Sequence, residues 1–143
     1  MPRIKFDLPN NFHFSTEIPL RITDINYGGH LGNDAVLSLA HEARIRFFRE
    51  HGWTEFDVGG AGIIMADAAI MFKAEGFYGD VLLIEIAVDD MTELGCDLLY
   101  RLTSKESAKE IARVKTGIVF FDYKSRKPTR VPESFRLAFD AAP

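Results

Sequence analysis

Apolar residues recur along this chain with two different periods. Between residues 34 and 51 they return every three or four residues, the spacing that places them on one face of an α-helix. Asn33 is the expected N-cap and His51 with Gly52 marks the end, so about 18 residues at 1.5 Å each make a helix of about 27 Å. The apolar stripe is wider than a surface helix needs, and we expect other elements to wrap around it. The residues of this stripe are Val36, Leu37, Leu39, Ala40, Ala43, Ile45, Phe47 and Phe48.

Most of the remaining chain alternates apolar and polar residues with a period of two, which is typical of β-strands. With one long helix expected, the connections lack the crossovers that a parallel sheet requires. The pattern therefore predicts an α+β fold, in which a mainly antiparallel sheet packs one face against the helix. Pro19 in the first strand has no N–H for the sheet and must lie at an edge or a bulge. The expected strands span residues 12–23, 63–72, 81–88, 98–103 and 111–123, the last two forming a hairpin around the polar loop 104–110.

Length and composition suggest one self-contained domain over residues 1–143, with 47% apolar residues to build a core. The formal net charge of −4 argues against a nucleic-acid binder, which needs a basic face to neutralise phosphates. Cys96 is the one cysteine and the N-terminus lacks a signal-peptide pattern, so we expect a cytoplasmic protein without disulfides. No apolar stretch reaches about 18 residues, and we expect no membrane insertion.

The glycine-containing segment 25–34 leads directly into the expected helix. Gly28, Gly29 and Gly32 allow the backbone to approach a ligand closely, and the first amides of a helix have no partners within it. Such amides stabilise the negative charge that develops on a carbonyl oxygen during acyl transfer, where one donor is typically worth about 2.7 to 4 kcal/mol. Alternatively, the glycines serve only to make a tight turn between strand and helix.

Three other features of the sequence give weaker indications of chemistry. His41 and Glu42 begin a zinc-protease pattern, but Ile45 stands where the second histidine is required, and we predict no metal site. Cys96 lacks neighbours that would activate a thiol and is interpreted as a buried structural residue. Segment 124–130 follows the last strand, and its cations either hold a phosphate-bearing ligand or form a solvated basic turn. These cations are Lys124, Arg126, Lys127 and Arg130.

Residues 21–44, RITDINYGGHLGNDAVLSLAHEAR, resemble the hotdog-fold acyl-CoA thioesterases of the 4-hydroxybenzoyl-CoA thioesterase type. The pattern of that family is an arginine, two aspartates separated by one residue, Gly-His-Val-Asn-Asn and a helix that ends in Glu-Ala-Arg. Residues 79–81 resemble the entry to the family's third strand, and residues 121–132 resemble its closing segment. The resemblance implies a hotdog fold, a curved antiparallel sheet of about five strands wrapped around one long central helix. The matching residues are Arg21, Asp24, Gly29, His30, Asn33, Glu42, Ala43 and Arg44.

The chain departs from this family at a position that matters for mechanism. The second aspartate of the motif, which acts as nucleophile or general base in the 4-hydroxybenzoyl enzymes, corresponds to Asn26. An amide neither accepts a proton near neutral pH nor attacks a thioester, so we expect Asn26 to orient a water instead. Gly32 and Val36 also replace an asparagine and an aromatic residue of the family pattern, which changes the shape of the acyl pocket.

Another residue must then supply the base. Glu42 is the first choice, because the related phenylacetyl-CoA thioesterases carry a carboxylate at a similar place on this helix; a salt bridge to Arg44 or Arg46 is the alternative. Asp67 interrupts an apolar run, where an acid needs a partner or a function, and plant acyl-carrier thioesterases have a histidine at the position of His30. The alternatives to Glu42 are Asp24, Asp67 and His30.

We therefore predict an enzyme that hydrolyses the thioester of an acyl-CoA or of an acyl-carrier protein to a free acid and a thiol. It needs no cofactor, since a thioester is already activated. The alternative is a non-catalytic hotdog module that binds acyl thioesters or serves as an assembly scaffold. Open sheet edges predict a homodimer or homotetramer. The expected catalytic residues are Asn26, His30, Glu42 and Asp24, and the expected substrate-binding residues are Tyr27, Gly29, Gly32, Asn33, Asp67 and Arg126.

Overall fold

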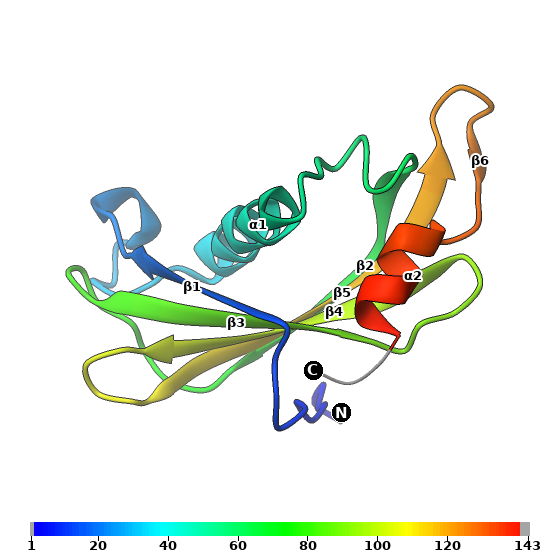
Figure 1. Cartoon of the computed structure of the whole chain (residues 1–143). Helices are drawn as coiled ribbons and strands as arrows, with labels where there is room; N and C mark the ends of the chain where they lie inside the picture. Colours follow the sequence, from blue (N-terminus) through cyan, green and yellow to red (C-terminus); the bar gives the residue numbers. More distant parts are fainter. Residues whose placement is uncertain (1, 141–143) are drawn as a thin grey trace.

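A curved antiparallel sheet lies under one long helix in the computed structural model, which describes residues 2–140 (Figure 1). The strand order is β1-β3-β4-β5-β2, and the short β6 pairs with β5. All pairs are antiparallel. The elements in chain order are β1 (Phe14–Pro19), the 3-10 helix η1 (Ile22–Asp24), α1 (Asn33–Glu50), β2 (Gly62–Phe72), β3 (Val81–Asp89), β4 (Gly95–Ser104), β5 (Glu110–Asp122), β6 (Lys127–Pro128) and α2 (Glu133–Phe139).

The core lies between α1 and the concave face of the sheet. Val36, Leu39, Ala40, Ala43 and Phe47 are at most 2% exposed, so the stripe predicted for the helix is the face that packs on the strands. Phe48 is also buried and accounts for part of the unusual width of this stripe, whereas Leu37 is 41% exposed and Ile45 is half-buried. The α+β fold and the central helix are confirmed.

A polar network fixes the rotation of α1 on the sheet. Arg44 is buried; its Nε donates to Glu55 Oε2 at 2.8 Å and its Nη1 donates to Tyr100 Oη at 3.1 Å. The Tyr100 hydroxyl is also hydrogen-bonded to Thr116 Oγ1, at 2.9 Å. Because α1, β4 and β5 all contribute, the network holds the helix in one orientation and thereby sets where its N-terminus lies.

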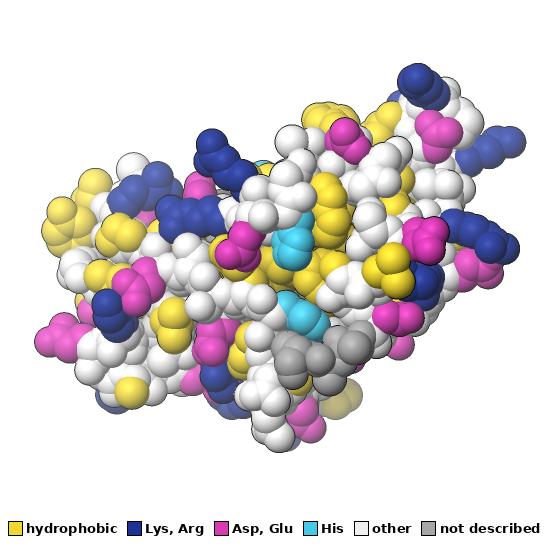
Figure 2. Space-filling model, viewed as in Figure 1, with side chains coloured by type: hydrophobic (Ala, Val, Ile, Leu, Met, Phe, Trp, Pro, Cys, Tyr) yellow, Lys and Arg dark blue, Asp and Glu magenta, His cyan; other side chains and the backbone are white. Residues whose placement is uncertain are grey.

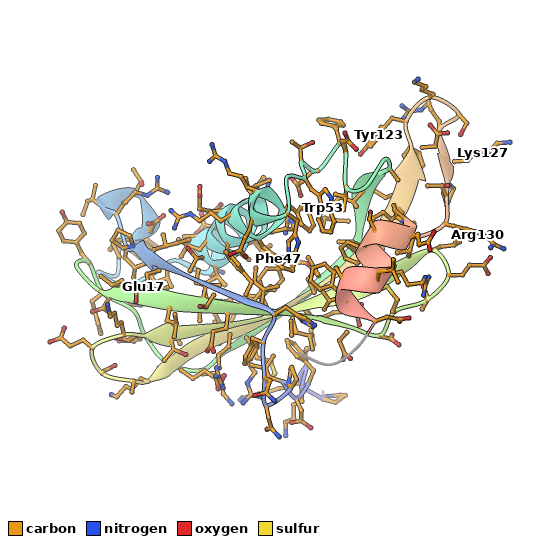
Figure 3. The ribbon with its side chains drawn as sticks, viewed as in Figure 1. Glu17, Phe47, Trp53, Tyr123, Lys127 and Arg130 are labelled. Carbon is orange, nitrogen blue, oxygen red and sulfur yellow. The ribbon has the colours of Figure 1, made fainter. Side chains whose placement is uncertain are left out.

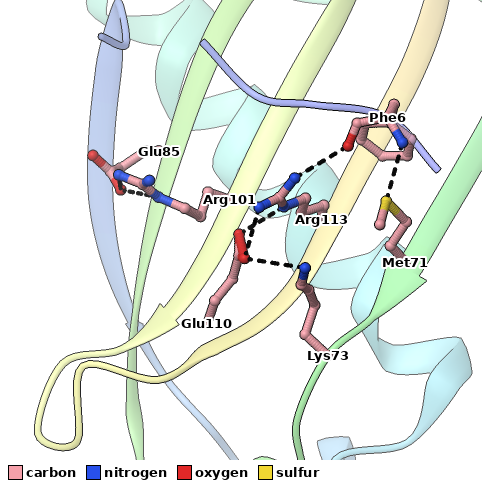
Figure 4. Close-up of polar contacts among 7 residues, drawn as sticks. All are labelled: Phe6, Met71, Lys73, Glu85, Arg101, Glu110 and Arg113. Carbon is pink, nitrogen blue, oxygen red and sulfur yellow. Dashed lines mark hydrogen bonds and ion pairs between the residues drawn. The ribbon is translucent and has the colours of Figure 1, made fainter. Parts of the chain in front are cut away.

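The outer face of the sheet carries ion pairs and the N-terminal segment (Figure 4). Glu85 and Arg101 pair across β3 and β4 at 2.9 Å. Glu110 pairs with Arg113, whose Nη1 also donates to the carbonyl oxygen of Phe6 at 3.1 Å. The hydrogen bond from Arg113 to Phe6 therefore holds the segment before β1 against the strands.

The first predicted strand was too long. β1 ends at Pro19, on an edge of the sheet as predicted for this proline, and the chain then curls into η1. The physical reason is the Asp24 carboxylate, which accepts a hydrogen bond from the Arg21 N–H at 2.8 Å and closes a tight turn. The N-cap of α1 is Gly32 rather than Asn33, because the Gly32 carbonyl accepts the Ala35 N–H and Asn33 already has helical geometry.

The sequence pattern missed β6 and α2. β6 has two residues and α2 has seven, too few for a period to be recognised. α2 closes one end of the core with aromatic rings: Phe135 lies 5.0 Å from Phe120 and Phe139 lies 5.3 Å from Phe47. Within residues 2–140 the structure contains no helix long and apolar enough to span a bilayer.

Candidate active site

A cavity of about 860 Å³ opens at the N-terminus of α1. Its walls come from the loop before α1, the first turn of α1, the end of β2 with the residues after it, and the start of β5. The lining combines apolar side chains with amide, imidazole and carboxylate groups. The lining residues are Asn26, Tyr27, His30, Leu31, Asn33, Asp34, Val36, Phe72, Lys73, Ala74, Glu75 and Ile111.

Backbone hydrogen bonds make the loop before α1 a defined structure. The Asn26 N–H donates to the His30 carbonyl at 2.9 Å, and the Gly29 N–H donates to the Asn26 carbonyl at 3.0 Å. Gly29 has a φ of 85°, in the left-handed region that glycine adopts without strain. The Gly28 N–H donates to Asn26 Oδ1 at 2.9 Å, so the oxygen of this amide is engaged and its NH₂ group remains to donate.

The entry into α1 leaves one of its first three amides without a partner within residues 2–140. The Asp34 N–H donates to Asn33 Oδ1 at 2.9 Å and the Ala35 N–H donates to the Gly32 carbonyl at 3.1 Å, whereas the Asn33 N–H makes no such bond. Gly32, the N-cap, has no side chain, and no side-chain cap hydrogen bond is made there. A Cβ on Gly32 would lie 2.7 Å from Asp34 Oδ1, so glycine at this position makes room for that carboxylate. Asn33 and Asp34 are exposed and line the cavity. The first turn therefore faces the cavity with partial positive charge, which favours an oxygen that becomes negative.

His30 has one ring nitrogen available for proton transfer. Its Nδ1 lies 3.3 Å from the Leu31 carbonyl oxygen, which can only accept a hydrogen bond, so Nδ1 carries the proton in this contact. Nε2 is then the accepting nitrogen. It lies on the side of Gly28, where a Cβ would be 3.4 Å from Nε2 and 3.2 Å from Asn26 Oδ1. Asn26 and His30 thus lie on the same side of the loop.

The structure gathers some of the predicted site residues and separates others. Asn26, Tyr27, His30 and Asn33 line the cavity, with Gly29 and Gly32 in the same loop. Tyr27 is fully exposed. Asp24 is buried behind this loop, where its carboxylate accepts the Arg21 N–H and its carbonyl accepts the Gly32 N–H.

Glu42 and Asp67 lie outside the cavity lining. Glu42 forms an ion pair with Arg46 at 2.9 Å, and Arg46 also donates to Thr16 Oγ1 on β1. Asp67 on β2 accepts from Lys115 at 2.8 Å and from the Gly117 N–H at 3.1 Å. The hydrogen bond and charge of Lys115 lower the pKa of Asp67.

Two carboxylates of the cavity were missed. Asp34 and Glu75 both line it, are exposed, and have no ion pair within residues 2–140. The position of Asp34 in the first helical turn was a usable signal, because that turn follows the glycine loop. Nothing local in the sequence indicates Glu75, which joins the site because the Leu31 N–H donates to the carbonyl of neighbouring Gly76 at 2.7 Å.

Arg126 lies far from the cavity in the same chain. It belongs to the turn between β5 and β6, and Figure 1 shows this hairpin at the opposite end of α1 from the helix N-terminus. Figure 3 shows Lys127 and Arg130 at the hairpin end of the sheet and Glu17 at the other.

Comparison with known proteins identifies the family. The family model of the thioesterase-like superfamily matches residues 20–139. The chain belongs to the thioesterase-like superfamily. No curated protein sequence matches it.

Solved structures of several thioesterases share the fold. A 1,4-dihydroxy-2-naphthoyl-CoA thioesterase from Synechocystis superposes with a TM-score of 0.80 and 23% identity, covering 89% of this chain and 95% of that one. A thioesterase superfamily structure from Jannaschia gives a TM-score of 0.81 at 16% identity, covering 92% and 83%. A DHNA-CoA thioesterase from Staphylococcus aureus gives 0.77 at 18%, covering 87% and 86%. These similarities support the hotdog fold that the sequence resemblance implied.

Proposed function

We propose that this protein hydrolyses the thioester of an acyl-CoA. The observation that carries the proposal is the cavity of about 860 Å³ that the first turn of α1 lines together with Asn26 and His30. Membership of the thioesterase-like superfamily supports thioester hydrolysis in general, and the coenzyme A substrates named for two structural relatives support CoA as the carrier. The 4-hydroxybenzoyl-CoA type, an acyl-carrier protein as carrier, and a cytoplasmic location remain predictions.

The proposed chemistry uses groups of the cavity in distinct roles. The thioester carbonyl oxygen lies against the first turn of α1, where the Asn33 N–H has no partner within residues 2–140, and this donor and the helix dipole stabilise the oxygen as it becomes negative. The NH₂ group of Asn26 holds a water by its oxygen, and a base removes a proton as the water attacks the carbonyl carbon. The C–S bond then breaks, the acid is released, and the thiolate takes up the proton.

The base is a carboxylate or His30. Asp34 lies in the cavity, and we propose it alongside Glu42, the residue that the sequence favours. For Glu42 to act, its side chain must leave Arg46, its partner at 2.9 Å. The candidates are separated by measuring kcat for Asp34→Asn and Glu42→Gln. If a carboxylate is the base, its variant loses about 100-fold or more and the other stays within a few-fold of the wild type; if both stay within a few-fold, His30 is the base.

To test the function, the purified protein is incubated with a panel of acyl-CoA substrates that differ in their acyl groups, and the release of free thiol is measured. We expect turnover that His30→Ala lowers strongly. If no thioester in the panel is hydrolysed above the uncatalysed rate, the enzymatic proposal is wrong.

Asn26 supports one alternative, a hotdog module that binds acyl thioesters without hydrolysing them. Here the amide stands where the family's aspartate acts, and its oxygen is committed to the Gly28 N–H. Tight binding of acyl-CoA with no turnover would favour this function over hydrolysis.

We also propose that the chain forms homodimers, as its open sheet edge predicts; a tetramer is the larger alternative. Light scattering at micromolar concentration gives the mass directly, and a monomer would contradict the proposal.

A further inference from the structure

Two carboxylates of the cavity have no cation beside them. Asp34 and Glu75 line the cavity and are exposed, and within residues 2–140 neither carboxylate forms an ion pair or accepts a hydrogen bond. They come from different elements, Asp34 from the first turn of α1 and Glu75 from the loop after β2. The cavity therefore presents two negative charges that the proposed hydrolysis does not use together.

The cations of the chain do not offset these charges. Lys73 belongs to the lining, but its ammonium lies 3.8 Å from Glu110. Glu110 also accepts two hydrogen bonds from Arg113, at 2.9 and 3.1 Å, so Lys73 is part of the ion-pair group on the outer face of the sheet (Figure 4). The basic turn between β5 and β6 lies at the opposite end of α1, and Figure 2 shows dark-blue side chains projecting from that corner of the molecule.

The dipole of α1 does not reverse the sign of the cavity. The N-terminus of a helix carries about half of a positive charge. Asp34 lies in the first turn, where its carboxylate offsets this partial charge, and Glu75 adds a second negative charge. The free donor of this turn, the Asn33 N–H, is the group proposed to bind the thioester carbonyl oxygen. Away from that oxygen, the cavity is negative.

The part of the cavity that suits an acyl chain lies beside the first of these carboxylates. Leu31, Val36 and Ile111 line the cavity and are at most 8% exposed, so they form an apolar floor on which an acyl chain can pack. Asp34 and Val36 belong to the same turn of α1. An acyl chain that packs on Val36 therefore lies within one helical turn of the Asp34 carboxylate.

Backbone hydrogen bonds hold the second carboxylate beside the same floor. On one side of Glu75, the Ala74 N–H donates to the Ile111 carbonyl at 3.1 Å. On the other side, the Gly76 carbonyl accepts the Leu31 N–H at 2.7 Å. Both bonding partners are floor residues, so the loop cannot carry Glu75 away from the acyl chain without breaking one of these bonds.

A charge at the end of the acyl group is then attracted or repelled by both carboxylates. Two unit charges about 6 to 8 Å apart at a solvent-exposed site change a binding constant by a few-fold, and two such interactions together change it roughly tenfold. A terminal ammonium gains this factor and a terminal carboxylate loses it, whereas a terminal methyl group has no charge to respond. Because Asp34 and Glu75 are exposed to water, salt should weaken the effect.

We propose that Asp34 and Glu75 make this cavity select the acyl group by charge: it takes acyl groups that end in an ammonium or an uncharged group and rejects those that end in a carboxylate. The inference rests on the proposed function for the identity of the carrier. It narrows the substrate class from acyl-CoA thioesters in general to those without an acidic acyl group, and it assigns Glu75 a role in specificity.

The first experiment measures the binding of CoA thioethers, which cannot be hydrolysed. S-(3-aminopropyl)-CoA is matched in shape by S-butyl-CoA, and S-(2-carboxyethyl)-CoA is matched by S-(3-methylbutyl)-CoA. The measured quantity is the ratio of the Kd values within each pair, in the wild type and in Asp34→Asn/Glu75→Gln. Relative to its alkyl match, the ammonium ligand should bind about tenfold more weakly in the variant and the carboxylate ligand about tenfold more tightly. The control Glu50→Gln/Glu106→Gln removes two exposed carboxylates elsewhere and should leave both ratios unchanged.

The opposite directions of the two shifts separate charge selection from a general loss of binding. Ratios that change by less than about threefold, or that move in the same direction, overturn the proposal. A wild type that binds none of the four thioethers also overturns it. Binding with the expected shifts but without hydrolysis of any acyl-CoA overturns the proposed function and supports the inference.

The second experiment follows the same preference in hydrolysis. The kcat/KM of glutaryl-CoA is compared with that of 5-methylhexanoyl-CoA, which has nearly the same shape without the charge. The single variant Glu75→Gln, which leaves the candidate base Asp34 in place, should raise this ratio about threefold. Raising the salt concentration from about 20 mM to about 500 mM should raise the wild-type ratio in the same direction and change the ratio of the variant less. A ratio that responds to neither the substitution nor the salt refutes the proposal.

Discussion

Substituting Asn26 by aspartate tests what the amide does in the cavity. The two side chains have the same shape, and an aspartate oxygen can accept the Gly28 N–H as Asn26 Oδ1 does at 2.9 Å. The backbone bonds of the loop to His30 and Gly29 do not involve the side chain. We therefore expect the free energy of unfolding to change by no more than about 0.5 kcal/mol. The second oxygen, in place of the NH₂ group, is then a base directed at the water.

The size of the effect follows from the surroundings of residue 26. A positioned general base contributes about 10²- to 10⁴-fold to a rate. The hydrogen bond from Gly28 and the nearby N-terminus of α1 both stabilise the carboxylate, which lowers its pKa and weakens it as a base. We therefore expect the lower end of this range, about a 100-fold gain in kcat/KM, and a rate that is flat between about pH 6 and 8.

The assay is steady-state thiol release from the best acyl-CoA of the panel, with Asn33→Asp as the control for added negative charge beside the helix. A gain for Asn26→Asp alone means that the amide limits the rate. A loss in kcat at unchanged KM would refute this reasoning and show that the Asn26 NH₂ group is itself required, by holding water or by stabilising the oxyanion.

Three further predictions concern the framework of the site. Tyr100→Phe leaves Arg44 and Thr116 with an unmet buried hydrogen bond each, and should lower the free energy of unfolding by about 1 to 3 kcal/mol in urea titrations; a change under about 0.5 kcal/mol would contradict the network's role. Burial of Glu55 disfavours its charged form, but the hydrogen bonds and charges of Arg44 and His41 outweigh burial and lower the pKa of Glu55. The ionised Glu55 therefore contributes its full stabilisation above the unfolded-state pKa of about 4.3, and this stabilisation is lost as the pH falls through the lower pKa of the folded state. The difference in free energy of unfolding between wild type and Glu55→Gln should shrink below about pH 4, and a constant difference down to about pH 2 would contradict this. Burial raises the pKa of Cys96 to about 12, so alkylation at pH 8 should be slow in the folded protein and fast in denaturant, and equal rates would show that the thiol is accessible.

The residues that carry a repeating pattern were predictable from the sequence. α1 and the four long strands were found because each repeats its period several times, and the helix stripe was wide because both Phe47 and Phe48 are buried. Features set by a few specific contacts were not predictable. η1 depends on reciprocal hydrogen bonds between Arg21 and Asp24, and α2 depends on aromatic partners from α1 and β5.

The loop of the site was predictable and the carboxylates were not. The glycines and the helix start placed Asn26, His30 and Asn33 together, because they are adjacent in sequence. Glu42 had two arginines within reach, and helical spacing alone could not choose between them. The packing of the folded chain determines the choice. Arg44 is buried under α1, where it is hydrogen-bonded to Tyr100 and Glu55, so Arg46, one turn after Glu42, is the residue that forms the ion pair with Glu42.

The position of the cavity at one end of β2 follows from the way the sheet holds α1. The helix runs within the concave face, and the Leu31 N–H fastens its entry loop to the Gly76 carbonyl just beyond β2. The helix N-terminus is thereby fixed near the edge of the sheet formed by β2. Within residues 2–140, β2 pairs with β5 on one side and with no strand on the other. A carbonyl group bound at the first turn of α1 would therefore lie near this edge of β2. If the proposed homodimer forms along this edge, a substitution that blocks the edge should weaken assembly and substrate binding together.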